Sequence, residues 1–322
     1  MIQLTVISGK GGTGKTTLTA AFASLAGSAV IADCDVDAAD MHLILEPRIL
    51  EKEDYCGLEV SMINPELCTK CGVCRESCRY GAINKDFGID HYRCEGCAVC
   101  SIVCPERAIS MEKRISGQAF YSETCLGPMA HARLDIGEET SGKLVSVVRS
   151  NAKKLAEKYH KNLIIIDGPP GTGCSAIAAI TGTDLVMVIV EPTVSGIHDM
   201  KRVLELVAHF TIPAFVCINK YDINEENTRL IEEFCTKTGI QVLGRLPYND
   251  IATKAMLHKQ TIIEYTKNNE YANEYANVSE FANQIRKIWA KVEETLVDLQ
   301  SKQEAITPLE MRKYKLSVKS EH

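Results

Sequence analysis

Apolar residues along the chain form short, nearly uninterrupted runs that alternate with stretches in which they recur at helical spacing. The short runs predict buried β-strands at residues 4–7, 29–32, 163–166, 185–190, 215–218 and 242–246. The helical spacing predicts helices at residues 18–25, 143–159 and 198–210. Such alternation is typical of a parallel sheet with helices on both faces. We therefore expect an α/β fold with a doubly wound, mostly parallel sheet.

The C-terminal part of the chain carries one further stripe at helical spacing. Its apolar members are Phe281, Ile285, Ile288, Trp289, Val292, Leu296 and Leu299. The stripe predicts a helix packed on a core. A membrane-seeking amphipathic helix is the alternative, which Glu293, Glu294 and Asp298 oppose because such helices favour lysine and arginine on the polar face. Residues 117–142 are polar without a clear period, and residues 301–322 form a basic tail.

A glycine-rich loop directly follows the first predicted strand and leads into the first predicted helix. It reads Ser8-Gly9-Lys10-Gly11-Gly12-Thr13-Gly14-Lys15-Thr16-Thr17 and fits the phosphate-binding motif G-x-x-x-x-G-K-S/T. In such a loop backbone N–H groups and the helix N-terminus hold the phosphates. Lys15 would reach the β- and γ-phosphates, and the Thr16 hydroxyl would ligate Mg²⁺. The motif predicts a nucleotide site made by Gly9, Gly11, Gly12, Thr13, Gly14, Lys15, Thr16 and Thr17.

A second motif lies in the cysteine-rich segment at residues 58–113. The spacing C-x₂-C-x₂-C-x₃-C occurs at Cys68, Cys71, Cys74 and Cys78 and again, 26 residues later, at Cys94, Cys97, Cys100 and Cys104. Val73 also matches Val99, and Ala82-Ile83 matches Ala108-Ile109, so the segment is an internal duplication. This spacing is typical of [4Fe–4S] ligation. Zinc is the competing metal, but a zinc site does not need the third and fourth cysteines of each copy.

Composition narrows the class of protein further. The 322 residues leave room for about two domains, and 45% hydrophobic and 24% charged residues are ordinary for a globular protein. A net charge of −6 argues against a nucleic-acid binder. Since no apolar run is long enough to span a membrane and the loop begins too early for a signal peptide, we expect a cytoplasmic protein without stable membrane insertion. Fourteen cysteines there favour metal ligation over disulfides.

The loop sequence G-K-G-G-T-G-K-T, with Lys10 directly after the first glycine, resembles the deviant Walker A loop of the MinD/ParA/Mrp ATPases. More distantly, it is similar to the nitrogenase iron protein. The resemblance implies an ATPase that works as a homodimer, in which Lys10 reaches the partner's nucleotide much as an arginine finger does.

The same resemblance assigns roles to residues that follow the predicted strands. Asp35 in the switch I segment 33–37 would position or activate the attacking water, with Asp33 or Asp37 supporting Mg²⁺. Asp167 would hold the Mg²⁺ shell, and Gly171 or Gly173 in switch II would offer a backbone N–H to the γ-phosphate. Asn219 would contact adenine. Residues 219–222, N-K-x-D, also resemble the guanine-reading element of GTPases, but Lys10 favours ATP.

The cysteine repeats resemble those of bacterial two-cluster ferredoxins, in which each copy lends its last cysteine to the other cluster. The resemblance implies one cluster on Cys68, Cys71, Cys74 and Cys104 and another on Cys94, Cys97, Cys100 and Cys78. Arg79 stands where such ferredoxins usually have proline. We expect an ATPase domain at residues 1–57 and 114–300, interrupted by a ferredoxin-like domain at residues 58–113. MinD-superfamily ATPases with an inserted ferredoxin domain have this layout.

One of the cysteines outside the repeats has a position of interest. Cys174 follows Asp167 by seven residues, the spacing at which the nitrogenase iron protein has a cysteine for a cluster shared between subunits. We hypothesise a third, dimer-seam cluster on Cys174, alone or with Cys125. Two inert cysteines are the alternative.

Three functions remain from the sequence. The leading one is an ATPase whose nucleotide state gates electron transfer from two [4Fe–4S] clusters to a donor or acceptor protein. The second is an iron–sulfur or metallocofactor assembly or carrier ATPase that delivers to an apo metalloprotein. The third, a MinD-like spatial organiser, is the least favoured because the C-terminal helix is a poor membrane binder.

Overall fold

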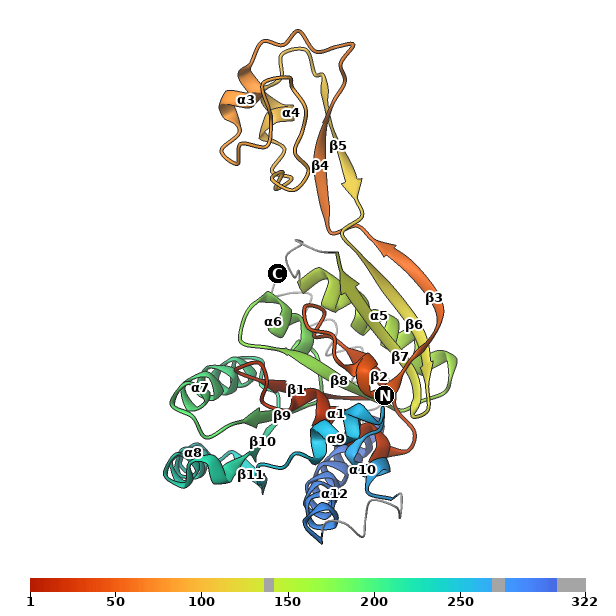
Figure 1. Cartoon of the computed structure of the whole chain (residues 1–322), viewed down its shortest axis with the longest axis vertical. Coiled ribbons are helices and arrows are strands. Elements are labelled where there is room, and N and C mark those ends of the chain that lie inside the picture. Colours follow the sequence, from red (N-terminus) through yellow and green to blue (C-terminus); the bar gives the residue numbers. More distant parts are fainter. Residues whose placement is uncertain (136–141, 268–275, 306–322) are drawn as a thin grey trace.

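The computed structural model describes residues 1–135, 142–267 and 276–305, and it is built around one nine-stranded sheet (Figure 1). Most of the predicted basic tail therefore lies outside the described residues. The strands in spatial order are β11 (Gln241–Leu246), β10 (Ala214–Asn219), β9 (Leu185–Val190), β1 (Ile2–Ser8), β8 (Leu163–Pro170), β2 (Val30–Asp33), β7 (Gly127–Leu134), β6 (Gly117–Thr124) and β3 (Arg48–Tyr55).

Seven of these strands, from β11 to β7, run parallel to one another. The prediction of an α/β fold with a mostly parallel sheet is therefore confirmed. Along β9 the side chains alternate between two cores: Leu185, Met187 and Ile189 belong to one, and Val186, Val188 and Val190 to the other. A strand buried on both faces has no polar positions, and this explains why these strands appear in the sequence as unbroken apolar runs.

Helices cover both faces of the sheet. The first layer packs on the core that contains Leu185, and it consists of α1 (Lys15–Ala26), α2 (Met41–Leu45), α9 (Ile251–Leu257), α10 (Ile262–Tyr265) and α12 (Ala276–Ala305). The opposite layer consists of α5 (Gly142–Lys158), α6 (Cys174–Ile180), α7 (Val194–His209) and α8 (Glu225–Thr238), with the short 3₁₀ turn η1 (Tyr221–Ile223) before α8. The body is therefore a three-layer α/β sandwich.

The C-terminal apolar stripe faces this core. Ile285 and Val292 are fully buried, and the Trp289 ring lies 5.5 Å from the Phe22 ring of α1. The prediction of a helix packed on a core is confirmed, and the stripe is not available as a membrane-binding face. Across the described residues, no helix is both long and apolar enough to cross a membrane.

The antiparallel edge of the sheet is the part that sequence patterns missed. β6 pairs antiparallel with both β7 and β3, within stretches for which no strand is predicted. β3 reads Arg-Ile-Leu-Glu-Lys-Glu-Asp-Tyr, and only its last residue is buried. Edge strands are often charged, so they lack the apolar alternation that marks a strand in a sequence.

A narrow arm projects from this edge (Figure 1). Its stem is the antiparallel pair β4 (Leu58–Ile63) and β5 (Ile109–Arg114), and its tip carries α3 (Val73–Ser77) and α4 (Val99–Val103). The buried side chains of the tip core are few: Cys74, Ile83, Cys100 and Ile109.

Backbone hydrogen bonds join the base of the arm to the body. The Ser116 amide donates to the Tyr55 carbonyl at 2.8 Å, and the Asp135 amide donates to the Ser116 carbonyl at 3.0 Å. The Gly57 amide donates to the Ser116 hydroxyl at 2.8 Å. The base of the arm is therefore tied to β3 and to the end of β7.

Candidate functional site

The glycine-rich loop joins β1 to α1 and is locked against the end of β10. Gly14 has a φ of 90°, and a Cβ there would lie 2.6 Å from the Asn219 amide nitrogen. That nitrogen instead donates to the Thr13 carbonyl at 2.8 Å. Gly14 is also the N-cap of α1, with no side-chain cap. The first N–H groups of α1 are thus left for an anion, as a phosphate site requires.

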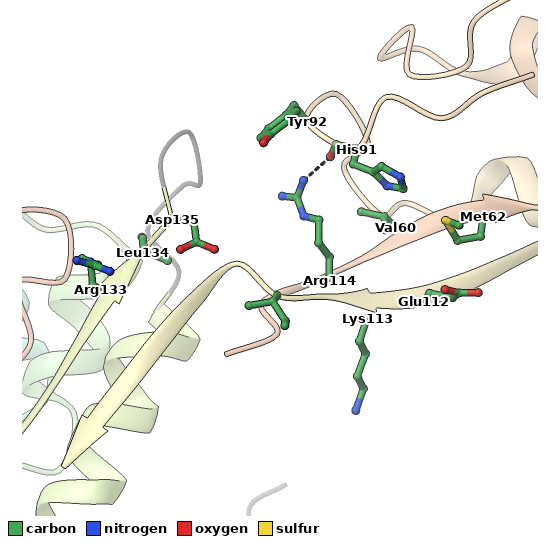
Figure 2. Close-up of a pocket in the computed structure, with 11 residues that line it drawn as sticks. Val60, Met62, His91, Tyr92, Glu112, Lys113, Arg114, Arg133, Leu134 and Asp135 are labelled. Carbon is green, nitrogen blue, oxygen red and sulfur yellow. Dashed lines mark hydrogen bonds between the residues drawn. The ribbon is translucent and has the colours of Figure 1, made fainter. Parts of the chain in front are cut away.

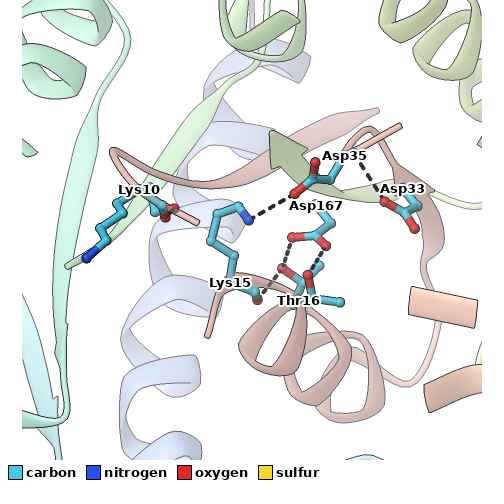
Figure 3. Close-up of polar contacts among 8 residues, drawn as sticks. Lys10, Lys15, Thr16, Asp33, Asp35 and Asp167 are labelled. Atoms are coloured by element: carbon cyan, nitrogen blue, oxygen red, sulfur yellow. Dashed lines mark hydrogen bonds and ion pairs between the residues drawn. The ribbon is translucent and has the colours of Figure 1, made fainter. Parts of the chain in front are cut away.

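Two parallel strands, β2 and β8, bring carboxylates to the start of α1 (Figure 3). The Lys15 ammonium lies 3.2 Å from Asp35 Oδ2, and both side chains are buried. Thr16 donates its hydroxyl hydrogen to Asp167 at 2.6 Å. Asp35 follows β2, whereas Asp167 lies within β8, opposite Asp33 on the adjacent strand. The loop, switch I and Walker B residues predicted from the sequence therefore lie together.

Burial dominates the electrostatics of these carboxylates. It raises the pKa of Asp167 to about 6, although the Lys15 charge and the Thr16 hydrogen bond act in the opposite direction. Burial, and then the Asp167 and Asp35 charges, raise the pKa of Asp33 well above its ordinary value. Asp33 Oδ2 has no hydrogen-bond partner among the described residues. These buried carboxylates carry more negative charge than the nearby Lys15 can balance. Oxygen ligands of this kind are the ones that Mg²⁺ prefers, so these residues fit that ion.

The two candidates for supporting Mg²⁺ in switch I differ in position. Asp33 is 1% exposed, whereas the Asp37 side chain is exposed. The Asp35 amide donates to Asp33 Oδ1 at 3.2 Å, which orients this carboxylate beneath the loop. Of the two, Asp33 lies with the other acidic groups.

Sequence patterns missed one member of this group, Thr19. Its hydroxyl donates a hydrogen bond to Asp167 Oδ1 at 3.1 Å, so two threonines hold the Asp167 carboxylate. The available signal was helical spacing, since Thr16 and Thr19 lie three residues apart on one face of α1.

Lys10 lies apart from these groups. Its side chain is exposed and points away from Lys15 in Figure 3. Within the described parts of the chain it makes no ion pair, and only its carbonyl is engaged, by the Ser8 hydroxyl at 2.6 Å. Its charge is therefore directed to the surface beside the loop.

A cavity of about 280 Å³ extends from the loop toward the ends of β10 and β11. It is lined by Gly12, Gly14, Thr17, Asn219, Lys220, Pro247 and Tyr248, among others. Lys220 forms an ion pair with Glu191 at the end of β9, a pair that sequence patterns did not reveal. Asp222, the aspartate of N-K-x-D, accepts a hydrogen bond from the Tyr248 amide at 2.7 Å. That carboxylate oxygen therefore already has a backbone partner.

Switch II begins inside β8, which continues to Pro170. The Gly171 amide donates to the Ser8 carbonyl at 2.9 Å, and Gly171 has a φ of 90°. In this conformation the Gly171 N–H is directed to the first strand, so contact with a γ-phosphate requires that bond to break. For Gly173, no backbone donor contact is found in the described part of the chain.

Cys174 and Cys125 lie at opposite ends of the parallel strands. Cys174 begins α6, after the carboxyl end of β8, on the side of the glycine-rich loop. Cys125 lies in the turn before β7, next to the start of β2, and its sulfur is 3.8 Å from Glu264. An eight-residue strand spans about 26 Å. The two cysteines therefore do not meet within one chain, because β8 separates them, and the hypothesis of a cluster at a dimer seam stays a prediction.

The arm contains two small pockets lined by cysteine. One is lined by Cys68, Cys71, Cys74 and Cys104, and the other by Cys78, Cys94, Cys97 and Cys100. Each pocket thus receives its fourth cysteine from the other copy of the motif. Among the described residues, no three His, Cys, Asp or Glu side chains converge tightly enough for one metal ion. A cubane cluster spaces its thiolates more widely than a single ion does, and four sulfur ligands suit it, so these residues fit a cluster.

An open hollow lies where the arm meets the body, between β5 and the end of β7 (Figure 2). Arg114 at the end of β5 extends toward the segment of His91 and Tyr92, donates to the His91 carbonyl and lies 5.8 Å from the Tyr92 ring. Tyr92 precedes Cys94 by two residues. Arg114 therefore holds the second cysteine copy against the stem of the arm.

Comparison with known proteins places the chain in a family. Residues 4–262 match the CobQ/CobB/MinD/ParA nucleotide binding domain. The chain belongs to this family. An uncharacterised protein of Methanocaldococcus jannaschii is 36% identical over 231 residues, which are 70% of this chain and 81% of that protein. The structure of the septum site-determining protein MinD of Pyrococcus horikoshii with Mg-ADP covers 91% of this chain and 96% of its own, with a TM-score of 0.56 at 15% identity.

Two relatives match shorter segments. Pyruvate synthase subunit PorD of Methanothermobacter marburgensis is 37% identical over 51 residues, which are 16% of this chain and 63% of that protein. The nitrogenase iron protein of Methanococcus voltae is 32% identical over 89 residues, which are 28% of this chain and 32% of that protein.

Proposed function

We propose that this protein is an ATPase that carries two [4Fe–4S] clusters and whose nucleotide state gates electron transfer to a partner protein. The nucleotide half of the proposal is supported by the family of the chain and by the geometry around Lys15, Asp35 and Asp167. ATP is favoured over GTP because the Tyr248 amide engages Asp222 and because the Asn219 amide lies at the cavity.

We propose residue roles for hydrolysis that are compatible with these contacts. Lys15 leaves Asp35 for the phosphates, and Asp35 then orients the attacking water. Thr16 and Asp167, with Asp33 below them, hold Mg²⁺, which supplies charge stabilisation at the phosphates. The N–H of Gly171 or Gly173 turns to the γ-phosphate. Lys10 reaches the nucleotide of a second copy in a homodimer, a role that its exposed position permits.

We further propose that residues 58–113 form the cluster domain, inserted between the two parts of the ATPase domain. The two four-cysteine pockets, both within the arm, support this division. When bound, such clusters supply one-electron transfer at low potential. The thiolates hold them, and the small apolar core around Ile83 and Ile109 limits access of water.

The proposed coupling between the nucleotide site and the arm rests on the strands that connect them. Asp33 of β2 lies opposite His131 of the parallel strand β7, and the amide of Asp135, just after β7, bonds to Ser116 at the base of the arm. The nucleotide site and the base of the arm therefore share one edge of the sheet. A change in switch I on nucleotide binding has a short mechanical route to the arm.

An anaerobic redox titration followed by EPR tests the proposal, with and without ATP and Mg²⁺. We expect the potential of at least one cluster to shift with ATP in the wild type and in Lys237→Ala, a control at an exposed lysine of α8. Lys15→Ala should abolish the shift. If both cluster potentials are the same with and without ATP in every variant, gating is refuted. If the protein contains no iron and sulfide, the cluster assignment is refuted.

A second function, cluster assembly or delivery to an apo metalloprotein, is favoured by one observation. Cys174 is exposed at the carboxyl edge of the sheet, beside the switch II loop. In this reading it holds an additional labile cluster across the homodimer. Iron content above that of the two arm clusters, lost in Cys174→Ala and retained in the Cys125→Ala control, would support delivery. Equal iron in all three proteins would contradict it.

A further inference from the structure

The two cysteine pockets of the arm have equivalent walls. A shift of 26 residues relates Cys68 to Cys94 and Ala82 to Ala108, and the same shift relates most other residues that line the pockets. Exposure also matches pair by pair: Cys74 and Cys100 are buried, Cys71 and Cys97 are exposed, and the remaining four are intermediate. The duplication therefore gives both pockets the same access to solvent.

Three pairs of wall positions break this equivalence: Ser61 and Phe87, Thr69 and Glu95, and Tyr80 and Glu106. The first pair matters most for the clusters, because Ser61 contacts a cysteine sulfur. Ser61 of β4 lines the pocket of Cys100, and the residue 26 positions later, Phe87, lines the pocket of Cys74. One pocket thus has a hydroxyl where the other has a phenyl ring. The two side chains have opposite chemistry toward sulfur, because a hydroxyl can donate a hydrogen bond and the ring cannot.

Ser61 is aimed at the cysteines. Its side chain is 2% exposed, and its oxygen lies 2.9 Å from Cys100 Sγ and 3.8 Å from Cys94 Sγ. A ligating thiolate has no proton to give, so the serine must be the donor when a cluster is bound. The other sulfur near the hydroxyl is Met111 Sδ, at 3.5 Å on the facing strand β5.

We infer that the Ser61 hydroxyl makes the two clusters electronically unequal by raising the reduction potential of the one held by Cys78, Cys94, Cys97 and Cys100. A hydrogen bond to a ligand sulfur stabilises the reduced, more negative cluster more than the oxidised one. This inference rests on the proposed function, since it requires the clusters to be present. The cluster with the higher potential is then the first of the two to be reduced.

Other contributions to the potentials are close to balanced. Glu95 lines the Ser61 pocket and Glu106 lines the Phe87 pocket, and both side chains are exposed. The pocket of Phe87 has one longer contact of its own, from the Ala108 amide to Cys104 Sγ at 3.4 Å. An O–H donor at 2.9 Å is the stronger of the two contacts.

The test compares Ser61→Ala, which removes the hydroxyl, with Ser61→Thr, which keeps it. Each protein is first assayed for iron and acid-labile sulfide, and the two cluster potentials are then measured by anaerobic titration with dithionite, followed by EPR. We expect two separate potentials in the wild type. In Ser61→Ala the higher one should fall toward the lower one, which should not move. In Ser61→Thr both should stay near the wild-type values.

The outcomes separate this inference from the function on which it rests. A wild type without iron and sulfide refutes the cluster assignment and the inference with it. Two intact clusters whose potentials are the same in wild type and Ser61→Ala refute only the role of Ser61. A shift of the lower potential alone would also overturn it, because the hydroxyl would then act on the wrong cluster.

Discussion

The body and the arm of this protein are stabilised in different ways. The body buries continuous apolar surface on both faces of its central strands, whereas the tip of the arm has a core of two isoleucines and two cysteines. A segment of this size rarely folds on apolar burial alone. Under the proposed function the ligands would play opposite roles: the folded body would receive a nucleotide, whereas the arm would need its clusters in order to fold.

The sharpest test of the comparison is removal of iron. Anaerobic chelation, or Cys100→Ala, should leave the tip of the arm without stable structure, because half of the residues in its small core are the proposed ligands themselves. Hydrogen exchange should show loss of protection at residues 58–114 and retained protection in β1, β8 and β9. Ser101→Ala serves as the matched control, since its side chain faces only the Ala98 carbonyl. Equal protection of the arm with and without iron would contradict the comparison.

In the body, we expect the largest effect on ATP hydrolysis from Lys15→Ala. Loss of this buried charge should lower the rate of ATP hydrolysis about 10³-fold, as for other electrostatic groups at a transition state. Phosphate release measures the rate, and Lys237→Ala is the control. The iron content of the arm should not change. A loss of iron together with activity would show that the two regions are not independent.

The packing of the body gives a smaller effect. Ile165→Ala at the centre of β8 should lower the free energy of unfolding by about 3 kcal/mol, since the side chain is fully buried. The single tryptophan, Trp289, packs on Phe22 in the body and is a selective reporter for urea unfolding. Ile102→Ala in the arm, where the side chain is 79% exposed, should leave the same transition in place. Equal shifts in both variants would argue against separate cores.

The smallest predicted effect is a pH dependence of the body without nucleotide or Mg²⁺. Burial raises the pKa of Asp167 from 3.8 to about 6, so the folded protein binds this proton more tightly than the unfolded chain. Its contribution, about 3 kcal/mol in full, is present below pH 4 and is lost as the pH rises through 6, with about 1 kcal/mol of it lost between pH 5 and pH 7. Urea unfolding read by Trp289 should show lower stability at pH 7 than at pH 5. Asp167→Asn should flatten the difference; an unchanged slope in that variant would assign it to other groups.

Sequence patterns were most informative where a single physical constraint decides which residue type can occupy a position. The apolar runs of β1, β8, β9 and β10 predicted the central strands, because residues buried on both faces must be apolar. The glycine-rich loop was recognisable because Gly14 has no room for a side chain beside Asn219. The antiparallel edge was missed because the exposed side chains of β3 carry no apolar alternation, and its strand order depends on pairing with β6.

The sequence by itself determined the class of fold, the family loop and the duplicated cysteine motif, since these follow from local spacing and chain order. Only the tertiary structure decided which distant groups meet. It brought Asp35 to Lys15, set Cys125 and Cys174 at opposite ends of the parallel strands, and placed Ser61 against Cys100 rather than against the other copy. Such contacts join residues tens of positions apart, and the register of strands and the direction of the arm fix them.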